Sequence, residues 1–159
     1  MTGSRMADNL FNSMLLVVDG SEPSIAAAHY AVDLASQSGG RITAIYVVDT
    51  ATMEYLTQMK IFVSEEREEF EKELEQTGRR YLDFVRTIAE KEGHEVDTII
   101  DNGTFHQVVL QAARDLPADV VVLGGWRRSI TRKDVTSVER QLILDQADCP
   151  VIVVKSQNK

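Results

Sequence analysis

An acid, a glycine and a hydroxyl directly follow the first apolar run of this chain. The run Met14–Val18 is continuous, and Asp19, Gly20 and Ser21 come next. A continuous apolar run is typical of a strand buried on both faces of a parallel sheet. Open α/β sheets bind their ligands at the carboxyl ends of such strands. These residues therefore predict a small-molecule pocket, although they do not predict a reaction.

The other reactive residue types form no recognisable catalytic or metal site. His29, His94 and His106 fall in different elements, without the i, i+4 spacing of a zinc site, and we expect His106 at the surface. Ser21 lacks the G-x-S-x-G setting of a hydrolase nucleophile, and no P-loop or G-x-G-x-x-G fingerprint occurs. Cys149 leads through a proline into an apolar run, so we expect a packed thiol. The sequence requires no metal.

Composition predicts one soluble domain in a reducing compartment. The chain has 159 residues, 43% of them hydrophobic, which is enough for one compact core. Its net charge of −8 argues against a general nucleic-acid or anionic-membrane binder, because the field repels phosphate. A single cysteine allows no internal disulfide. We expect a cytoplasmic protein with a flexible leader at residues 1–13 and one domain at residues 14–156.

Strand and helix patterns alternate along the whole chain. Ser21 is a good N-cap for a first helix that ends at Gly39, and Thr104 with Gln107 forms a T-x-x-Q capping box. We interpret the glutamates between residues 65 and 75 as a solvated helix face rather than a cation site. Further helices are expected at 64–92, 104–116 and 137–147, a loop at 50–61, and strands at 14–18, 42–48, 95–100, 120–123 and 151–154.

This order of elements predicts an α/β fold. Right-handed crossovers between parallel strands produce a doubly wound five-stranded parallel sheet with helices on both faces, a three-layer sandwich. In the inferred order the last strand lies at the sheet edge and is wholly apolar, so it is prone to pair with a second copy of the chain. Alternatively, the C-terminal tail or the leader covers it. The expected homodimer interface consists of Val151, Ile152, Val153 and Val154.

Four segments of the chain resemble the universal stress protein family. They are VVDGSEPS at 17–24, VVD at 47–49, DVVVLG at 119–124 and CPVIVV at 149–154. The resemblance implies a five-stranded parallel sheet, frequent dimers and, in many members, an adenine nucleotide at the carboxyl edge of the sheet. It implies nucleotide contacts from Val18, Asp19 and Val47, with Asp19 accepting from a ribose hydroxyl and Val47 offering backbone to the base. A turn or helix-capping role would explain Asp19 equally well.

The glycine signature of the nucleotide-binding members is broken in this chain. That signature reads Gly, two residues, Gly, nine residues, then Gly followed by Ser or Thr. Gly124 matches the first position, and Arg127 stands at the second. The third falls on Ser137 by spacing, or on Thr136 if Thr136, Ser137 and Val138 replace Gly-Ser-Val. Glycine lets the backbone approach phosphate closely and point amides at it, so the expected phosphate contact is in doubt.

Two further features of this loop have opposite effects on phosphate binding. Thr136 and Glu139 form a T-x-x-E capping box that would satisfy the free amides a phosphate otherwise takes. Arginine and lysine side chains pair directly with phosphate, although here they would equally offset an acidic surface. The cations of the loop are Arg127, Arg128, Arg132 and Lys133.

We expect a non-enzymatic domain that binds ATP or another adenine nucleotide weakly or atypically, in stress response or signalling. The alternative is a nucleotide-free protein-interaction module of the same fold. It would recognise an acidic partner protein through Trp126 and the basic loop at residues 126–133. A slow nucleotide hydrolase is the third hypothesis, and the sequence offers no evident base or metal pair near the loop to support it.

Overall fold

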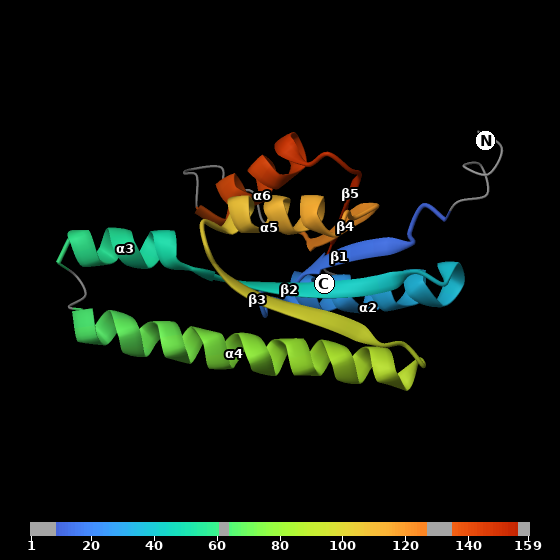
Figure 1. Ribbon diagram of the computed structural model, residues 1–159, viewed down its shortest axis with the longest axis horizontal. Coiled ribbons are helices and arrows are strands. Elements are labelled where there is room, and N and C mark those ends of the chain that lie inside the picture. The colour runs from blue at the N-terminus through green and yellow to red at the C-terminus, as the bar shows by residue number, and fades with distance from the viewer. Residues whose placement is uncertain (1–8, 61–63, 127–134, 156–159) are drawn as a thin grey trace.

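A five-stranded, all-parallel sheet forms the middle layer of the protein (Figure 1). The computed structural model describes residues 9–60, 64–126 and 135–155. The strand order is β3-β2-β1-β4-β5, which confirms the predicted doubly wound sheet. The strands are β1 Ser13–Val17, β2 Arg41–Asp49, β3 Val96–Gly103, β4 Val120–Gly124 and β5 Val151–Val154.

Helices cover both faces of the sheet (Figure 1). One face carries α2, Glu22–Ser38, and α4, Ser64–Lys91. The opposite face carries α5, Phe105–Asp115, and α6, Val135–Gln146. A short helix, α3, Thr50–Gln58, continues from β2 and extends with the start of α4 beyond the carboxyl ends of the strands. This arrangement confirms the predicted three-layer sandwich.

Local capping fixes the ends of α2 as the sequence predicted. The Ser21 hydroxyl accepts a hydrogen bond from the Ser24 amide at 3.3 Å. At the other end, Gly39 adopts the left-handed conformation with φ 76°, and its amide bonds to the Ala35 carbonyl. The helix is therefore bounded by two short-range signals that need no tertiary contact.

The loop predicted at residues 50–61 is wrong over most of its length, because Thr50–Gln58 is α3. Among the described side chains of this helix, only Met53 is strongly buried: it is 1% exposed and joins the core between the sheet and α4. A single buried residue gives no readable helical period, so tertiary packing decides the structure here.

Two other sequence predictions need correction. The third strand does not end at Ile100 but continues to Gly103, because β2 supplies partners as far as Asp49. Thr104 does occupy the N-cap of α5, but its side chain makes no capping hydrogen bond. The predicted capping box of Thr104 and Gln107 is therefore wrong.

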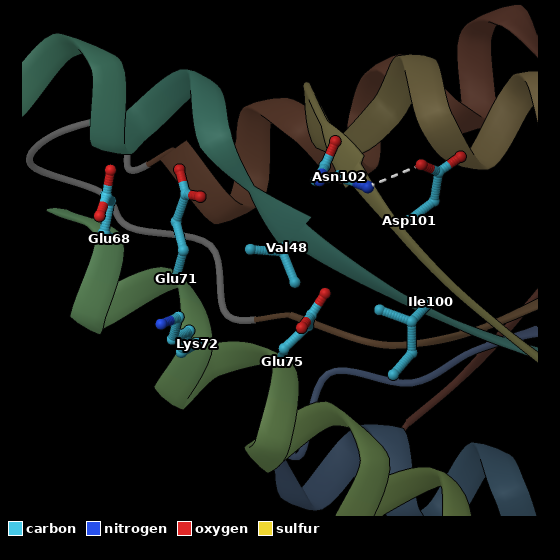
Figure 2. Close-up of a pocket in the computed structure, with 8 residues that line it drawn as sticks. All are labelled: Val48, Glu68, Glu71, Lys72, Glu75, Ile100, Asp101 and Asn102. Carbon is cyan, nitrogen blue, oxygen red and sulfur yellow. Dashed lines mark hydrogen bonds between the residues drawn. The ribbon is translucent and has the colours of Figure 1, made fainter.

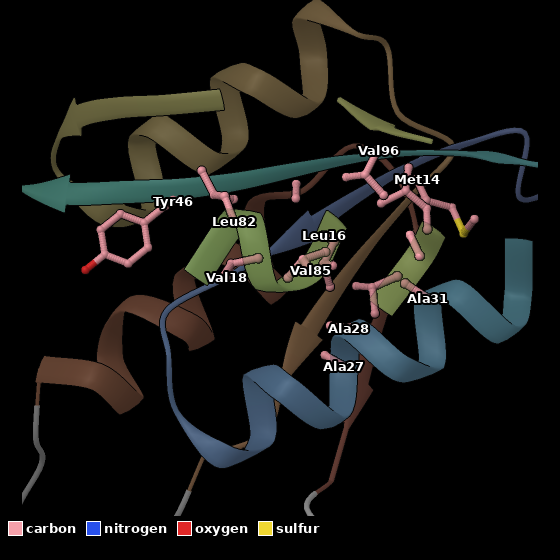
Figure 3. Close-up of a cluster of buried hydrophobic side chains, with 14 of the residues drawn as sticks. Met14, Leu16, Val18, Ala27, Ala28, Ala31, Tyr46, Leu82, Val85 and Val96 are labelled. Atoms are coloured by element: carbon pink, nitrogen blue, oxygen red, sulfur yellow. The ribbon is translucent and has the colours of Figure 1, made fainter. Parts of the chain in front are cut away.

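Alternation along β1 divides the core into two clusters. Met14 and Leu16 point toward α2 and α4, whereas Leu15 and Val17 point toward α5 and α6. All four are at most 1% exposed. Figure 3 shows the first cluster, in which the small residues of α2 allow its backbone to approach the sheet closely. These small residues include Ala27, Ala28 and Ala31.

The residues just before β1 pack against the rest of the domain. The side-chain nitrogen Nδ2 of Asn9 donates a hydrogen bond to the Ser38 carbonyl at 2.7 Å, and Phe11 packs against the first cluster. Of the predicted leader at residues 1–13, residues 1–8 lie outside the described residues. Within residues 9–60, 64–126 and 135–155, none of the helices has the length and apolar character that spanning a bilayer would take.

Gly124 allows β4 to meet the start of α2 at backbone distance. A Cβ at this position would lie 2.6 Å from the Pro23 carbonyl carbon and from the Ser24 amide nitrogen. At the next residue, Gly125, the nearest atom to such a Cβ would be the Val154 carbonyl oxygen at 3.4 Å. Gly124 is therefore required by close packing of backbone on backbone, and Gly125 is not.

We expect Gly124→Ala to lower the free energy of unfolding by about 2 kcal/mol or more, because the helix must move away from the strand. Urea denaturation followed by circular dichroism measures the effect. Gly125→Ala is the matched control and should change stability by less than about 1 kcal/mol. Equal denaturation midpoints for the two variants would contradict this packing role.

Candidate functional site

The carboxyl ends of β1 and β4 lie side by side at the point where the strand order reverses. From β1 the chain continues to β2 on one side, while β4 on the other side is reached from β3. Leu16 pairs with Val122 in the shared register, so Asp19 and Gly124 follow at the same edge of the sheet. Crevices at such switch points are where open α/β sheets bind ligands.

Asp19 is engaged on both carboxylate oxygens. Oδ1 accepts hydrogen bonds from the Ser21 amide at 2.9 Å and from the Ser21 hydroxyl at 2.6 Å. Oδ2 accepts from the Arg140 guanidinium, with which it forms an ion pair. The amide of Asp19 in turn donates to the Ser24 hydroxyl at 3.0 Å. Asp19 thus shapes the turn into α2 and also holds a charge from α6.

Arg140 fills the space between three elements at this edge. Its side chain is only 8% exposed, and its guanidinium carbon lies 4.5 Å from the centre of the Phe105 ring at the start of α5. Guanidinium groups bind favourably over aromatic faces. The cation is therefore held between the ring of Phe105 and the carboxylate of Asp19.

Sequence reasoning missed both Arg140 and Phe105. A signal for Arg140 was present: it lies three residues before Ile143, the fully buried apolar residue of α6. Residues three apart share a helix face, so a charge there points inward and requires a partner. Its pairing with Asp19, 121 positions away, was not visible in the sequence.

The environment of Asp19 favours its charged form. Burial alone would raise the pKa of this carboxyl, but the hydrogen bonds from Ser21 and the positive charge of Arg140 outweigh burial and lower the pKa below its ordinary value. On the face of the sheet that α4 covers, burial raises the pKa of Tyr46, and the nearby Tyr81 and Asp19 raise this pKa further. Tyr46 and Tyr81 stack with ring centres 6.4 Å apart.

A second polar contact joins the start of α5 to α6. Glu139 accepts from the His106 amide at 2.9 Å, and its carboxylate lies 3.0 Å from His106 Nδ1. Their side chains are 14% and 15% exposed, so the prediction of a surface histidine is wrong. Glu139 caps the start of α5 across the helix pair rather than reaching back to its own helix. The Glu139 half of the predicted capping box is therefore wrong, and the side chain of Thr136 lies outside the described part of the structure.

The remaining residues predicted to contact a nucleotide lie at different places along the carboxyl edge of the sheet. Val18 is buried toward α2 and α4, and its amide bonds to the Ile45 carbonyl at 2.9 Å. Val47 is buried on the opposite face. In the first turn of α6, Val138 is exposed while Ser137 is half-buried and has an interaction of its own.

The basic loop cannot be placed in the same way. Arg127, Arg128, Arg132 and Lys133 lie outside the described residues. Trp126, the residue before them, packs against the second cluster. A half-buried tryptophan in that position covers the end of the core.

A separate pocket opens between α4 and the ends of β2 and β3 (Figure 2). It encloses about 220 Å³, and Glu68, Glu71, Glu75 and Asp101 line it together with Lys72. Such a lining repels phosphate, so this pocket does not suit an anionic nucleotide. Glu71 is also paired with Arg67 at 3.2 Å. Among the described residues, no group of three or more His, Cys, Asp or Glu side chains is arranged to hold a metal ion.

Comparison with known proteins identifies relatives over nearly the whole chain. A sequence model of the universal stress protein family matches residues 11–155. The universal stress protein MJ0531 of Methanocaldococcus jannaschii is 26% identical over 98% of this chain and 88% of its own length. The universal stress protein YxiE of Bacillus subtilis is 26% identical over 92% of this chain and 100% of its own length.

Solved structures share the fold. The hypothetical protein MJ0577 superposes with a TM-score of 0.72, at 18% identity over 94% of this chain and 99% of that protein. A universal stress protein in complex with cAMP has a TM-score of 0.62, at 13% identity over 92% and 98% of the two chains. The Archaeoglobus fulgidus protein in complex with dAMP has a TM-score of 0.61, at 14% identity over 92% and 99%.

We expect Asp19→Asn to destabilise the protein by about 3 kcal/mol at pH 7, because it removes the negative charge from a largely buried ion pair with Arg140. The lowered pKa means that the charged carboxylate contributes stability above the unfolded pKa of about 3.9, and that this contribution is lost as pH falls through the folded pKa. The stability difference from wild type should therefore be constant between about pH 7 and 5 and shrink below about pH 4.

Urea denaturation at a series of pH values measures this difference. Asp97→Asn is the matched control: Asp97 pairs with Arg41 at 3.3 Å, but the two side chains are 68% and 81% exposed. Loss of that exposed pair should cost less than about 1 kcal/mol. A similarly small loss of stability for Asp19→Asn would show that the buried pair does not stabilise this edge of the sheet.

Proposed function

The chain belongs to the universal stress protein family, and we propose that it binds an adenine nucleotide weakly at the carboxyl edge between β1 and β4. In this proposal the domain acts by binding in a stress response or in signalling and catalyses no reaction. The single cysteine fits a reducing, cytoplasmic environment.

The main support for this proposal is the pairing of Asp19 with Arg140 at the point where the strand order reverses. It places a hydroxyl acceptor and a cation together at the edge where α/β sheets bind ligands. A ribose and a phosphate are the matching groups of a nucleotide. Structures of the same fold contain cAMP and dAMP, which supports an adenine nucleotide as the ligand class.

Two features of this chain support weak rather than tight binding. Ser21 and Arg140 already take three of the roughly four acceptor positions on the two oxygens of Asp19, which leaves little capacity for a ribose hydroxyl. Arg127 and either Thr136 or Ser137 stand where the family signature has glycine, and side chains at these positions keep backbone amides away from phosphate.

The ion pair between Asp19 and Arg140 also supports the alternative function, a nucleotide-free interaction module. Asp19 and Arg140 satisfy one another, so the edge of the sheet is electrostatically complete without a ligand. A protein-interaction role would then require no nucleotide. Titration with adenine nucleotides separates the two functions.

We expect isothermal titration calorimetry to give dissociation constants near or above about 100 μM for AMP, ADP and ATP, which is about −5.5 kcal/mol of binding free energy. Because the glycines that hold further phosphates are absent, ATP should bind within about threefold of AMP. GMP is the control and should bind more weakly than AMP.

Micromolar binding with a strong preference for ATP would contradict the weak, atypical site. Complete indifference to all adenine nucleotides would instead favour the interaction module.

We also propose that β5 pairs with β5 of a second copy of the chain. This strand lies at the end of the sheet, with β4 on one side and no strand on the other among the described residues. Its four apolar residues are only half-buried. An unpaired apolar edge favours antiparallel pairing across a two-fold axis.

We expect Val153→Lys to convert a dimer into a monomer, because a charge on the edge strand opposes pairing with another chain. Size-exclusion chromatography with light scattering measures the mass. Asn102→Lys, which adds the same charge on the opposite edge strand β3, should leave the dimer intact. A wild-type monomer, or equal effects of both variants, would contradict pairing through β5.

A further inference from the structure

We infer that a cavity at the amino ends of the strands binds a free α-amino acid in its zwitterionic form. The cavity encloses about 490 Å³ and is lined by groups of both charges, by hydroxyls and by a short apolar wall. It lies at the opposite end of the sheet from Asp19 and Gly124, which follow the carboxyl ends of β1 and β4. The inference therefore goes beyond the proposed nucleotide site and does not depend on it.

The cavity lies beside the last turn of α5, where the chain leaves the face of the sheet. The apolar residues of α5 share a core cluster with Ile45 of β2. The helix ends at Asp115, and the chain then passes through Leu116 and Pro117 toward β4. Thr43 lies two residues before Ile45 on the same face of β2, and it lines the cavity together with Leu116 and Pro117.

Thr43 is a buried polar residue whose hydroxyl is available to a ligand. The residue is only 8% exposed, yet its side chain has no hydrogen-bond partner in the described part of the chain. Within that same part, no side-chain nitrogen or oxygen that is sealed from solvent lacks a partner. The Thr43 hydroxyl must therefore reach the cavity. A hydroxyl held largely away from water gains a hydrogen bond when a polar ligand fills the cavity.

Opposite charges flank Ser13 in one row across three neighbouring strands. Ser13 of β1 pairs with Arg41 of β2. On its other side, the Ser13 carbonyl accepts a hydrogen bond at 2.7 Å from the amide of Asp119, which directly precedes β4. Two strand spacings, roughly 10 Å, separate the backbones of Arg41 and Asp119. The cavity therefore has a positive side and a negative side, with Ser13 between them.

Both charged groups keep capacity to bind a ligand. Arg41 Nη2 donates to Asp97 Oδ2 at 3.3 Å, and the other donors of the guanidinium fork remain. Asp119 Oδ2 accepts the Ser13 amide at 2.8 Å, and residues 9–60, 64–126 and 135–155 supply no further hydrogen bond or ion pair to this carboxylate. A ligand carboxylate can thus bind Arg41 while a ligand ammonium binds Asp119, and both existing contacts persist.

A zwitterion matches this arrangement better than a molecule with one kind of charge. Asp119 would repel a purely anionic ligand, and Arg41 would repel a purely cationic one. In a free α-amino acid each charge faces its opposite, Thr43 offers its hydroxyl, and an apolar side chain contacts Leu116 and Pro117. Because the Arg41 side chain is 81% exposed, water and salt screen the charge pairing. We therefore expect millimolar affinity.

The first experiment titrates the wild-type protein with L-leucine and follows the backbone amides by NMR. The signals of Ser13, Arg41, Thr43 and Asp97 should shift saturably, with a dissociation constant of about 1 mM. N-acetyl-L-leucine lacks the ammonium group and L-leucinamide lacks the carboxylate, so each should bind at least about fivefold more weakly. The absence of saturable shifts at these residues would overturn the inference, as would an equal affinity for either analogue.

The second experiment repeats the L-leucine titration with Thr43→Val, which removes the hydroxyl at nearly constant volume. Binding should weaken by about threefold or more, because a hydrogen bond to the ligand is lost. Thr98→Val is the matched control: Thr98 follows Asp97 on β3, and its hydroxyl accepts from Arg86 at 3.1 Å instead of lining this cavity. This control should keep the wild-type affinity. Unchanged binding in Thr43→Val, or an equal loss in both variants, would overturn the role of Thr43, and the wild-type analogue series tests the site without any variant.

Discussion

The ion pair between Asp19 and Arg140 is the interaction on which the functional edge of this protein depends. It joins the turn after β1 to the second turn of α6, two segments that meet only because β1 and β4 are neighbours. Both side chains are largely removed from water, and the ion pair offsets part of the cost of burying each charge. The same pair organises the local structure of this edge, because it ties the turn after β1 to α6.

Close packing around this pair leaves little freedom in the surrounding backbone. Gly124 brings β4 against the first turn of α2, and a Cβ on Gly20 would lie 2.3 Å from the Tyr81 ring. Tyr81 stacks in turn on Tyr46, whose pKa is raised by burial first and by the nearby Tyr81 and Asp19 second. The turn that carries Asp19 is therefore held between α2, α4 and α6. Such rigid support positions a carboxylate accurately, and it also means that a ligand must fit the turn as it stands.

Membership of the universal stress protein family establishes the fold of this chain, whereas the place of a ligand and its affinity are our proposals. Family members of the same fold have been solved with cAMP and dAMP, yet their identity to this chain is 13% and 14%. The departures of this chain lie in the phosphate half of the site, where glycine is replaced. Its acidic pocket between α4 and β3 does not supply a substitute, because Glu68, Glu75 and Asp101 repel the same phosphates. Arg140 is a described cation at the edge between β1 and β4.

The sequence by itself determined the α/β class, the order of the strands and the bounds of α2, because these follow from local periodicity, from capping by Ser21 and Gly39, and from the handedness of crossover connections. It also placed Asp19 and Gly124 at one edge of the sheet. Only the tertiary structure decided that Asp19 pairs with Arg140, that Glu139 caps α5 through His106, and that residues 50–58 form a helix. Each of these depends on contacts between residues far apart in the chain, and no local pattern encodes which distant partner a buried charge or a lone apolar residue will meet.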